Sequence, residues 1–152
     1  MIEITDVRAL RDRIGEEIAV GDWFEVSQAR IDQFAAATGD TQWIHVDPAR
    51  AAVESPFKTT IAHGFLTLSL VSTLIREAMT FHGLRMAINY GTNRVRFVAP
   101  VPAGSQIRGR FTPISVEDAS GSVQVTWKAT IEREHTDKPC CVVEWVVRYY
   151  PA

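Results

Sequence analysis

The chain has 152 residues, of which 46% are hydrophobic and 22% are charged, proportions that are typical of a soluble globular protein. This length is the usual size of one domain, so we expect residues 1–152 to form a single domain. The formal net charge is −2 and like charges form no long run. A nucleic acid partner is therefore not expected, because phosphate neutralisation needs a concentrated basic face.

Three features of the sequence bear on its compartment. The two cysteines, Cys140 and Cys141, are adjacent in an apolar segment, where neighbouring strand residues point to opposite faces, so neither a disulfide framework nor a metal site is expected. Residues 1–10 lack the basic and apolar regions of a secretory signal. The longest apolar stretch, residues 61–75, is too short to span a bilayer. We expect a cytoplasmic protein that is not embedded in a membrane.

The first half of the chain has the pattern of short helices. Ser27 is a suitable N-cap for a helix that Gly39 is expected to end, which leaves Asp40 just beyond the helix. The apolar face of this helix comprises Ile31, Phe34 and Ala35. The pair Asp47-Pro48 predicts a second, brief helix through residue 52. Residues 41–46 must therefore form a tight connection.

The second half predicts one long helix followed by strands. Residues 64–82 are apolar almost all round at helical spacing, which places a helix inside the protein, ended by Gly83. Segments rich in Val, Ile, Thr and aromatic residues then predict strands at 86–90, 93–97, 106–116, 122–134 and 140–150, with a turn at Gly91. This order predicts an α+β fold in which a curved antiparallel sheet wraps around the long helix.

The connection between the first two helices holds a carboxylate and an imidazole five residues apart, Asp40 and His45. Hydration of a double bond requires such a pair, because one group removes a proton from water while another protonates the neighbouring carbon. In a second interpretation Asp40 caps a backbone turn and His45 is a packed histidine bonded to a carbonyl group. The spacing alone does not decide between these two interpretations.

A second candidate element lies where the long helix begins. Backbone N–H groups at a helix N-terminus have no partner within the helix, and Gly64 allows a ligand to approach them closely, so its amide is a candidate oxyanion donor. Alternatively, Gly64 serves only close packing of the helix against the sheet. His63 is interpreted as structural, since no partner for it is evident in the sequence.

The motifs occur in a characteristic order: Gly39-Asp40 with His45, Asp47-Pro48, Ala62-His63-Gly64 before a helix, and Val95 to Val101 followed by Gly104. This set, which covers about residues 20 to 110, resembles the MaoC-like dehydratases, a family that includes the (R)-specific enoyl-CoA hydratases. Gln42-Trp43-Ile44-His45 stands where Asn-Pro-aliphatic-His is more usual, and this is similar to the nodulation protein N branch.

The resemblance implies a hot dog fold and a homodimer with active sites at the subunit interface. It also implies that Asp40 and His45 hold and activate water and that the Gly64 amide binds the thioester oxygen. Ser72 stands where some members place a serine beside the catalytic pair; alternatively, its hydroxyl only bonds to the preceding helical turn. Trp43 replaces a proline that shapes the bend, and it either shapes the acyl pocket or packs in the core. No metal or organic cofactor is implied beyond the coenzyme A of the substrate, for whose phosphates Arg94, Arg96 and Arg108 are candidates.

The expected function is thus (R)-specific hydration of trans-2-enoyl-CoA to (R)-3-hydroxyacyl-CoA, and the reverse dehydration. The substrate thioester is carried by coenzyme A or by an acyl carrier protein. Two alternatives share the fold: an acyl-CoA thioesterase, which directs water at the carbonyl group, and a non-catalytic protein that binds acyl thioesters.

Overall fold

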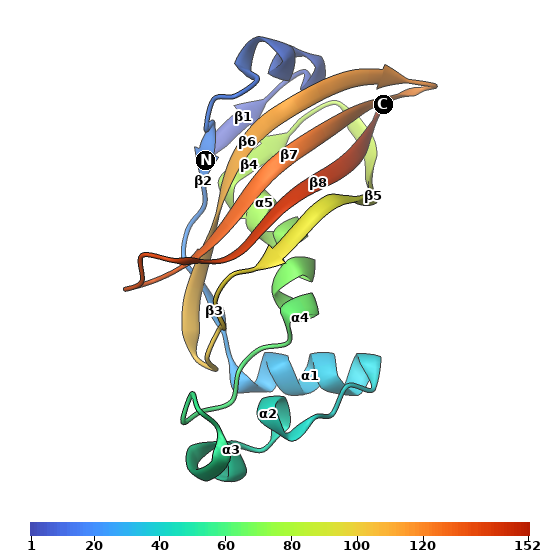
Figure 1. Cartoon of the computed structure of the whole chain (residues 1–152). Coiled ribbons are helices and arrows are strands. Elements are labelled where there is room, and N and C mark those ends of the chain that lie inside the picture. The colour runs from blue at the N-terminus through green and yellow to red at the C-terminus, as the bar shows by residue number, and fades with distance from the viewer.

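The computed structural model describes residues 1–152, and one strongly curved antiparallel sheet forms most of it (Figure 1). Its long strands are β5 (Leu84–Phe97), β6 (Ser105–Ala119), β7 (Ser122–Arg133) and β8 (Pro139–Pro151). The strand order is β2-β6-β7-β8-β5, and both β2 (Ala19–Val20) and β3 (Phe24–Val26) pair with β6. Helices at one end and an antiparallel sheet confirm the predicted α+β class.

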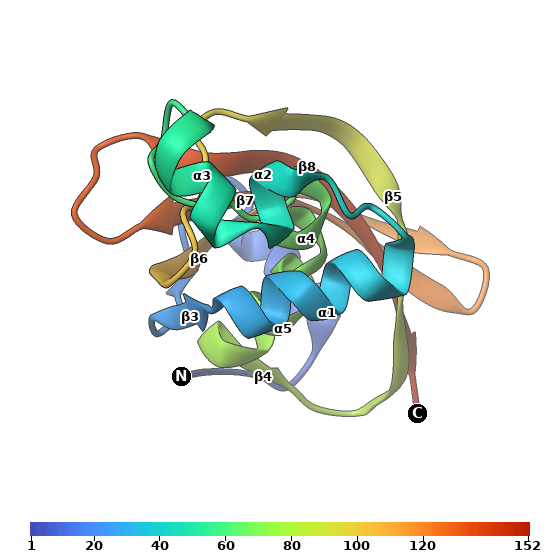
Figure 2. The ribbon, with the colours of Figure 1, turned by 90° about the horizontal axis from the view of Figure 1, so that it is seen from below.

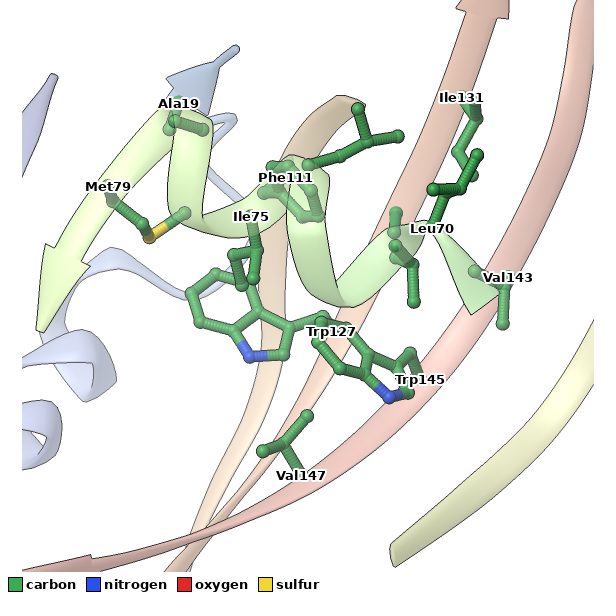
Figure 3. Packing of buried hydrophobic residues seen from close by; sticks show 14 of the residues in the cluster. Ala19, Leu70, Ile75, Met79, Phe111, Trp127, Ile131, Val143, Trp145 and Val147 are labelled. Carbon is green, nitrogen blue, oxygen red and sulfur yellow. The ribbon is translucent and has the colours of Figure 1, made fainter. Parts of the chain in front are cut away.

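The concave face of the sheet is filled by a broken helix made of α4 (Gly64–Ser69) and α5 (Val71–Ala78). Ile75 of this helix belongs to the same buried cluster as Phe111 and Trp127 of the sheet (Figure 3). Full burial of a Leu, Ile or Phe side chain contributes about 1.5–3 kcal/mol. The apolar contacts therefore hold the helix firmly and fix the position of its first residue, Gly64.

The helix predicted over residues 64–82 is wrong at its end. Leu70 separates α4 from α5, and the helix stops at Ala78. Met79–Phe81 instead form strand β4, which pairs in parallel with β1 (Ile2–Ile4). Apolar and β-branched residues suit a strand as well as a buried helix, and here the backbone of β1 provides hydrogen-bonding partners.

A layer of short helices lies across one end of the sheet, next to the start of α4 (Figure 2). It consists of α1 (Gln28–Thr38), α2 (Trp43–Val46) and α3 (Pro48–Glu54). The helices predicted after Ser27 and at Asp47-Pro48 are confirmed, and the tight connection between them contains the single turn α2. The layer brings this connection close to the N-terminus of α4.

Between β1 and β2 lies the 3₁₀-helix η1 (Val7–Arg13), which buries Val7 and Leu10. None of the helices is both long and apolar enough to cross a bilayer.

Strand β5 is the free edge of the sheet and is exposed along nearly all of its length. The two strands predicted at 86–90 and 93–97 are one continuous strand, and the turn predicted at Gly91 is wrong. Its pairing with β8 shifts register three times, between Leu84 and Met86, between Asn89 and Gly91, and between Thr92 and Arg94. These β-bulges absorb extra residues without ending the strand.

Candidate active site

The C-terminus of α1 positions Asp40. Gly39 adopts a left-handed conformation with φ +80°, which glycine reaches without strain, and its N–H donates to the carbonyl oxygen of Ala35 at 2.8 Å. The Asp40 carboxylate is exposed, and its Oδ1 accepts a long hydrogen bond of 3.4 Å from the N–H of Gln42. The turn-capping role is therefore present but weak, and it leaves the second carboxylate oxygen free.

His45 is buried in α2, and its tautomer follows from its contacts. Its Nδ1 lies 2.7 Å from the carbonyl oxygen of Ile61. A carbonyl oxygen only accepts, so Nδ1 carries the proton, and Nε2 of the neutral ring keeps a lone pair for another donor. Two further hydrogen bonds hold the α2 backbone. Gln28 Nε2 donates to the carbonyl oxygen of His45 at 2.7 Å. The N–H of Ile61 donates to the carbonyl oxygen of Ile44 at 3.0 Å.

His63 is buried directly before α4 and contacts both residues of the pair. Its Nε2 donates to the backbone carbonyl oxygen of Asp40 at 2.9 Å, so its Nδ1 is the unprotonated nitrogen of the neutral ring. That Nδ1 is buried and has no hydrogen-bond partner. No sequence pattern indicated this contact, because the partner, Asp40, lies 23 residues earlier in the chain.

These three side chains form one cluster. An oxygen of the Asp40 carboxylate and one ring nitrogen each of His45 and His63 all lie within 4.8 Å of one another. The imidazole rings are stacked, with centroids 3.8 Å apart and planes 23° apart. Lone pairs of stacked rings lie in nearly parallel planes and do not converge on one ion, so the arrangement suits acid/base chemistry better than metal binding.

Gly64 is the first residue of α4, next to His63 in the chain. Its N–H has no backbone acceptor, as expected for the first turn of a helix. A Cβ atom at Gly64 would lie 3.1 Å from ring carbons of Phe97, so the ring of Phe97 covers the Cα atom closely. The structure thus places a free backbone donor beside the cluster of Asp40 and the two histidines.

Ser72 lies eight residues beyond Gly64, about 12 Å along the helix at 1.5 Å per residue. Its Oγ accepts a bond of 3.3 Å from Asn89 Nδ2. Together with Asn89 it borders an apolar cavity of about 480 Å³ between α5 and β5. Other lining residues are Ile75, Met79, Leu84, Ala87, Trp145 and Val147. A smaller cavity is lined by Leu68 and shares Ser72, Asn89 and Trp145 with the larger one. The two cavities therefore lie next to each other along α4 and α5.

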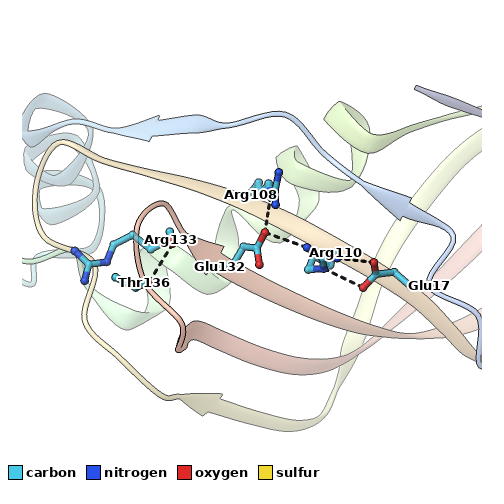
Figure 4. A network of polar contacts seen from close by, with 6 residues as sticks. All are labelled: Glu17, Arg108, Arg110, Glu132, Arg133 and Thr136. Carbon is cyan, nitrogen blue, oxygen red and sulfur yellow. Dashed lines mark hydrogen bonds and ion pairs between the residues drawn. The ribbon is translucent and has the colours of Figure 1, made fainter.

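The arginines considered for phosphate binding differ in their surroundings. Arg108 Nε donates to the Glu132 carboxylate (Figure 4). The Arg108 guanidinium also lies 4.3 Å from the centroid of the Trp23 ring. Arg94 and Arg96 lie on β5 and border another cavity. Trp43 is half-buried, with the Arg50 guanidinium 4.4 Å from the centroid of its ring.

Comparisons with known proteins agree with this geometry. Residues 10–134 match the model of the MaoC like domain. The chain is 52% identical over 136 residues, covering 89% of each protein, to 3-hydroxyacyl-thioester dehydratase Z of Mycobacterium tuberculosis. It is 48% identical over 141 residues to nodulation protein N of Rhizobium leguminosarum bv. viciae, covering 88% of this chain and 84% of that protein.

Solved structures share the fold. The monoamine oxidase regulatory protein of Archaeoglobus superposes with a TM-score of 0.72 at 25% identity, covering 91% of this chain and 92% of that one. An (R)-hydratase of Pseudomonas aeruginosa superposes with a TM-score of 0.69 at 23% identity, covering 91% and 83%. The sheet wrapped around α4 and α5 is thus the expected hot dog fold. On the family match and these identities, the chain belongs to the MaoC-like dehydratase family.

Proposed function

We propose that this protein catalyses the reversible, (R)-specific hydration of trans-2-enoyl-CoA to (R)-3-hydroxyacyl-CoA, with Asp40 and His45 as the acid/base pair. The observation that carries the proposal is the approach of the Asp40 carboxylate and a His45 ring nitrogen to within 4.8 Å, next to the free N–H of Gly64. The similarity to a protein named 3-hydroxyacyl-thioester dehydratase supports the same class of reaction.

In this mechanism the thioester carbonyl accepts a hydrogen bond from the Gly64 N–H. Water between Asp40 and His45 attacks carbon 3, and the same pair delivers a proton to carbon 2. The negative charge that forms on the thioester oxygen is stabilised by the Gly64 donor, and one such donor is typically worth about 3–4 kcal/mol. The lone pair on His45 Nε2 is available because Nδ1–H is held by Ile61. No metal or organic cofactor takes part in the proposed reaction.

His63 acts as a positioning residue. Its bond to the Asp40 carbonyl fixes the turn that carries the carboxylate, and its ring fixes the plane of His45. Its unpartnered Nδ1 is a further acceptor for ordered water in the site. Ser72 contributes to substrate binding through the apolar cavity, where the acyl chain extends along α5.

The functional unit is proposed to be a homodimer joined at the free edge of β5. The first half of this strand exposes Met86, Ile88 and Tyr90, by 41%, 44% and 58%. A long exposed edge with apolar side chains is a template for pairing with a second copy. Size-exclusion chromatography with light scattering should give twice the chain mass for the native protein and the chain mass for Ile88→Lys. A native monomer would contradict the dimer.

The hydratase reaction is tested by loss of enoyl-thioester absorbance with crotonyl-CoA and a longer trans-2-enoyl-CoA. An (R)-specific dehydrogenase then reports the handedness of the product. We expect turnover to the (R)-alcohol, reduced about a hundredfold or more in Asp40→Asn. Near-normal activity of that variant would disprove the assigned pair. Release of free thiol without loss of the alkene would indicate a thioesterase, and thermal stabilisation without turnover would indicate a binding protein.

Two further experiments test the remaining parts of the proposal. Activity that survives dialysis against a chelator tests the absence of a metal requirement. Cell fractionation tests the proposed cytoplasmic location.

A further inference from the structure

The helix that carries His45 is too short to fix its own position. It is the single turn Trp43–Val46, and no side chain caps its N-terminus. The last four carbonyl groups of a helix have no partner within it, and one isolated turn is unstable in water. The carbonyl groups of Ile44 and His45 therefore depend on donors from other segments, and so does the placement of the imidazole.

Gln28 provides the donor for the His45 carbonyl group. It is the first residue of α1, which lies alongside α2 (Figure 2). Its Nε2 lies 2.7 Å from the carbonyl oxygen of His45 and 2.8 Å from Oδ1 of Asp32. A carbonyl group and an ionised carboxylate only accept hydrogen bonds, so both must face the amide nitrogen of Gln28. Both N–H groups of this amide are thus in use.

Thr60 holds the oxygen end of the same amide. Its hydroxyl group donates to Oε1 of Gln28. Thr60 is only 1% exposed, so water does not compete for this bond. The carbonyl oxygen of Thr60 accepts from the N–H of Ala103 at 2.9 Å, which ties it to the segment before β6. The amide of Gln28 is therefore held in one orientation, with its nitrogen toward His45.

The same segment also holds the ring of His45. Thr60 directly precedes Ile61, whose carbonyl oxygen accepts from Nδ1 of His45 at 2.7 Å. Two neighbouring residues thus control His45 at two points, the ring directly and the backbone through Gln28. Fixing both points sets the position of the residue and the rotation of its ring. Together they determine where Nε2 lies relative to the Asp40 carboxylate.

We infer that Gln28 and Thr60 are positioning residues of the acid/base pair, which act by holding the backbone of His45. The inference rests on the proposed hydratase function for the role of His45. Neither residue supplies a group for the reaction, so their loss leaves substrate binding intact and displaces Nε2 from the position that the transition state requires. Such a defect lowers kcat and leaves KM nearly unchanged.

The first test replaces the donor of Gln28. Gln28→Met removes the hydrogen bonds at similar side-chain length, and we expect kcat to fall about tenfold at every pH. Gln28→Glu can donate to the His45 carbonyl only when it is protonated. Its kcat, relative to the native protein at the same pH, should be about tenfold low near pH 8 and should recover as the pH is lowered toward about 5. Gln33→Met, at an exposed position of α1, is the control and should not change kcat.

The second test separates the hydroxyl group of Thr60 from its shape. Thr60→Val keeps the shape and loses the donor, whereas Thr60→Ser keeps the donor and loses a methyl group. We expect kcat to fall about fivefold in Thr60→Val and to stay near the native value in Thr60→Ser. Equal kcat values for these two variants would overturn the role of the hydroxyl group. A Gln28→Glu defect that does not depend on pH would overturn the role of the amide.

Nuclear magnetic resonance of the His45 ring tests the inference without turnover. In the native protein the ¹⁵N signals should report a neutral ring protonated at Nδ1, with a slowly exchanging Nδ1–H. Exchange of this proton should be faster in Gln28→Met and Thr60→Val than in Gln33→Met and Thr60→Ser. Unchanged exchange in the first two variants would overturn the inference. Faster exchange in a native protein that lacks hydratase activity would refute the proposed function and leave the positioning of His45 supported.

Discussion

The imidazole rings of His45 and His63 stack with their centroids 3.8 Å apart, although 18 positions separate the two residues in the chain. The stack joins α2 to the start of α4, and the His63 bond to the Asp40 carbonyl adds the end of α1. We expect His63→Phe to lower kcat about tenfold with little change in KM, because one hydrogen bond of about 1–1.5 kcal/mol that orients the acid/base pair is lost.

The matched variant is His63→Gln, whose amide nitrogen can occupy the place of Nε2 and donate to the same carbonyl. It should retain more of kcat than His63→Phe, although it loses the ring. Steady-state kinetics on a trans-2-enoyl-CoA measures both. Equal kcat values for the two variants would argue against a role for the bond to Asp40.

His45→Asn tests the proposed catalytic role of Nε2 separately from the structural hydrogen bond of Nδ1. The asparagine amide can still donate to the Ile61 carbonyl, as Nδ1 does at 2.7 Å, but no group replaces Nε2. We expect kcat to fall by about a hundredfold or more while the melting temperature stays close to that of the native protein. His45→Leu should in addition lose about 1–3 kcal/mol of stability, because the Ile61 carbonyl is then left unpaired. A stable His45→Asn protein with normal turnover would refute the role of Nε2.

Gly64→Ala should be destabilising because of Phe97. The added methyl group would lie 3.1 Å from the ring, so the ring must shift, at a cost of about 1 kcal/mol or more. The Phe97→Ala background removes the clash, and a double-mutant cycle of chemical denaturation should show that the penalty of Gly64→Ala shrinks there. Additive effects would mean that the penalty arises elsewhere, for example from the backbone of α4.

Ala87→Leu tests the acyl cavity. The larger side chain would fill part of the 480 Å³ between α5 and β5. We expect kcat/KM for a long trans-2-enoyl-CoA to fall while that for crotonyl-CoA changes by less than about threefold, since a few methylene groups in an apolar pocket are worth about 1–3 kcal/mol. A parallel loss on both chain lengths would place the acyl chain outside this cavity.

The ion pairs of the convex face predict a pH-dependent contribution to stability. Partial burial pushes the pKa of Glu132 upward, but the hydrogen bonds and charges of Arg108 and Arg110 outweigh it and hold the pKa below its ordinary value. Because its pKa is lowered in the folded state, Glu132 stabilises the fold at pH values above its unfolded-state pKa of about 4.3. This stabilisation is lost as the pH falls through the folded-state pKa.

Glu132→Gln should therefore reduce the free energy of unfolding by about 1 kcal/mol at pH 7. The difference from the native protein should disappear under acid conditions. Chemical denaturation at several pH values measures this, with the exposed Glu117→Gln as the control. A difference that persists when all carboxylates are protonated would point to packing rather than charge.

The proximity of Asp40 and His45 was predictable because a helix end and a following N-cap fix a short connection, and a short connection keeps its side chains close. The role of His63 was not predictable, since its contacts depend on how α4 meets the layer of short helices. Nothing in the local sequence pattern encodes that meeting. The same reasoning covers Ser72, which lies in α5, beyond the break at Leu70 that separates it from the start of α4.

The errors in the fold have a similar origin. Local pattern describes Met79–Phe81 equally well as helix or strand, and β1, at the far end of the sequence, decides the outcome. Gly91 looks like a turn because glycine is common in turns, yet β8 continues beside it and supplies hydrogen bonds on both sides of the irregularity. Pairing between distant segments overrode local preference in both places.

The bulges of β5 also determine where the strand can accept a deletion. Each of the three register shifts adds one residue to β5 opposite β8. Deleting the extra residue of one bulge would restore regular pairing there and leave the later residues opposite their present β8 partners, so Phe97 would stay over Gly64. Deleting a residue from the regular stretch after the last bulge would instead turn side chains over and carry Phe97 away from Gly64. Shortening of this strand should therefore be tolerated at the bulges and not in the stretch that follows them.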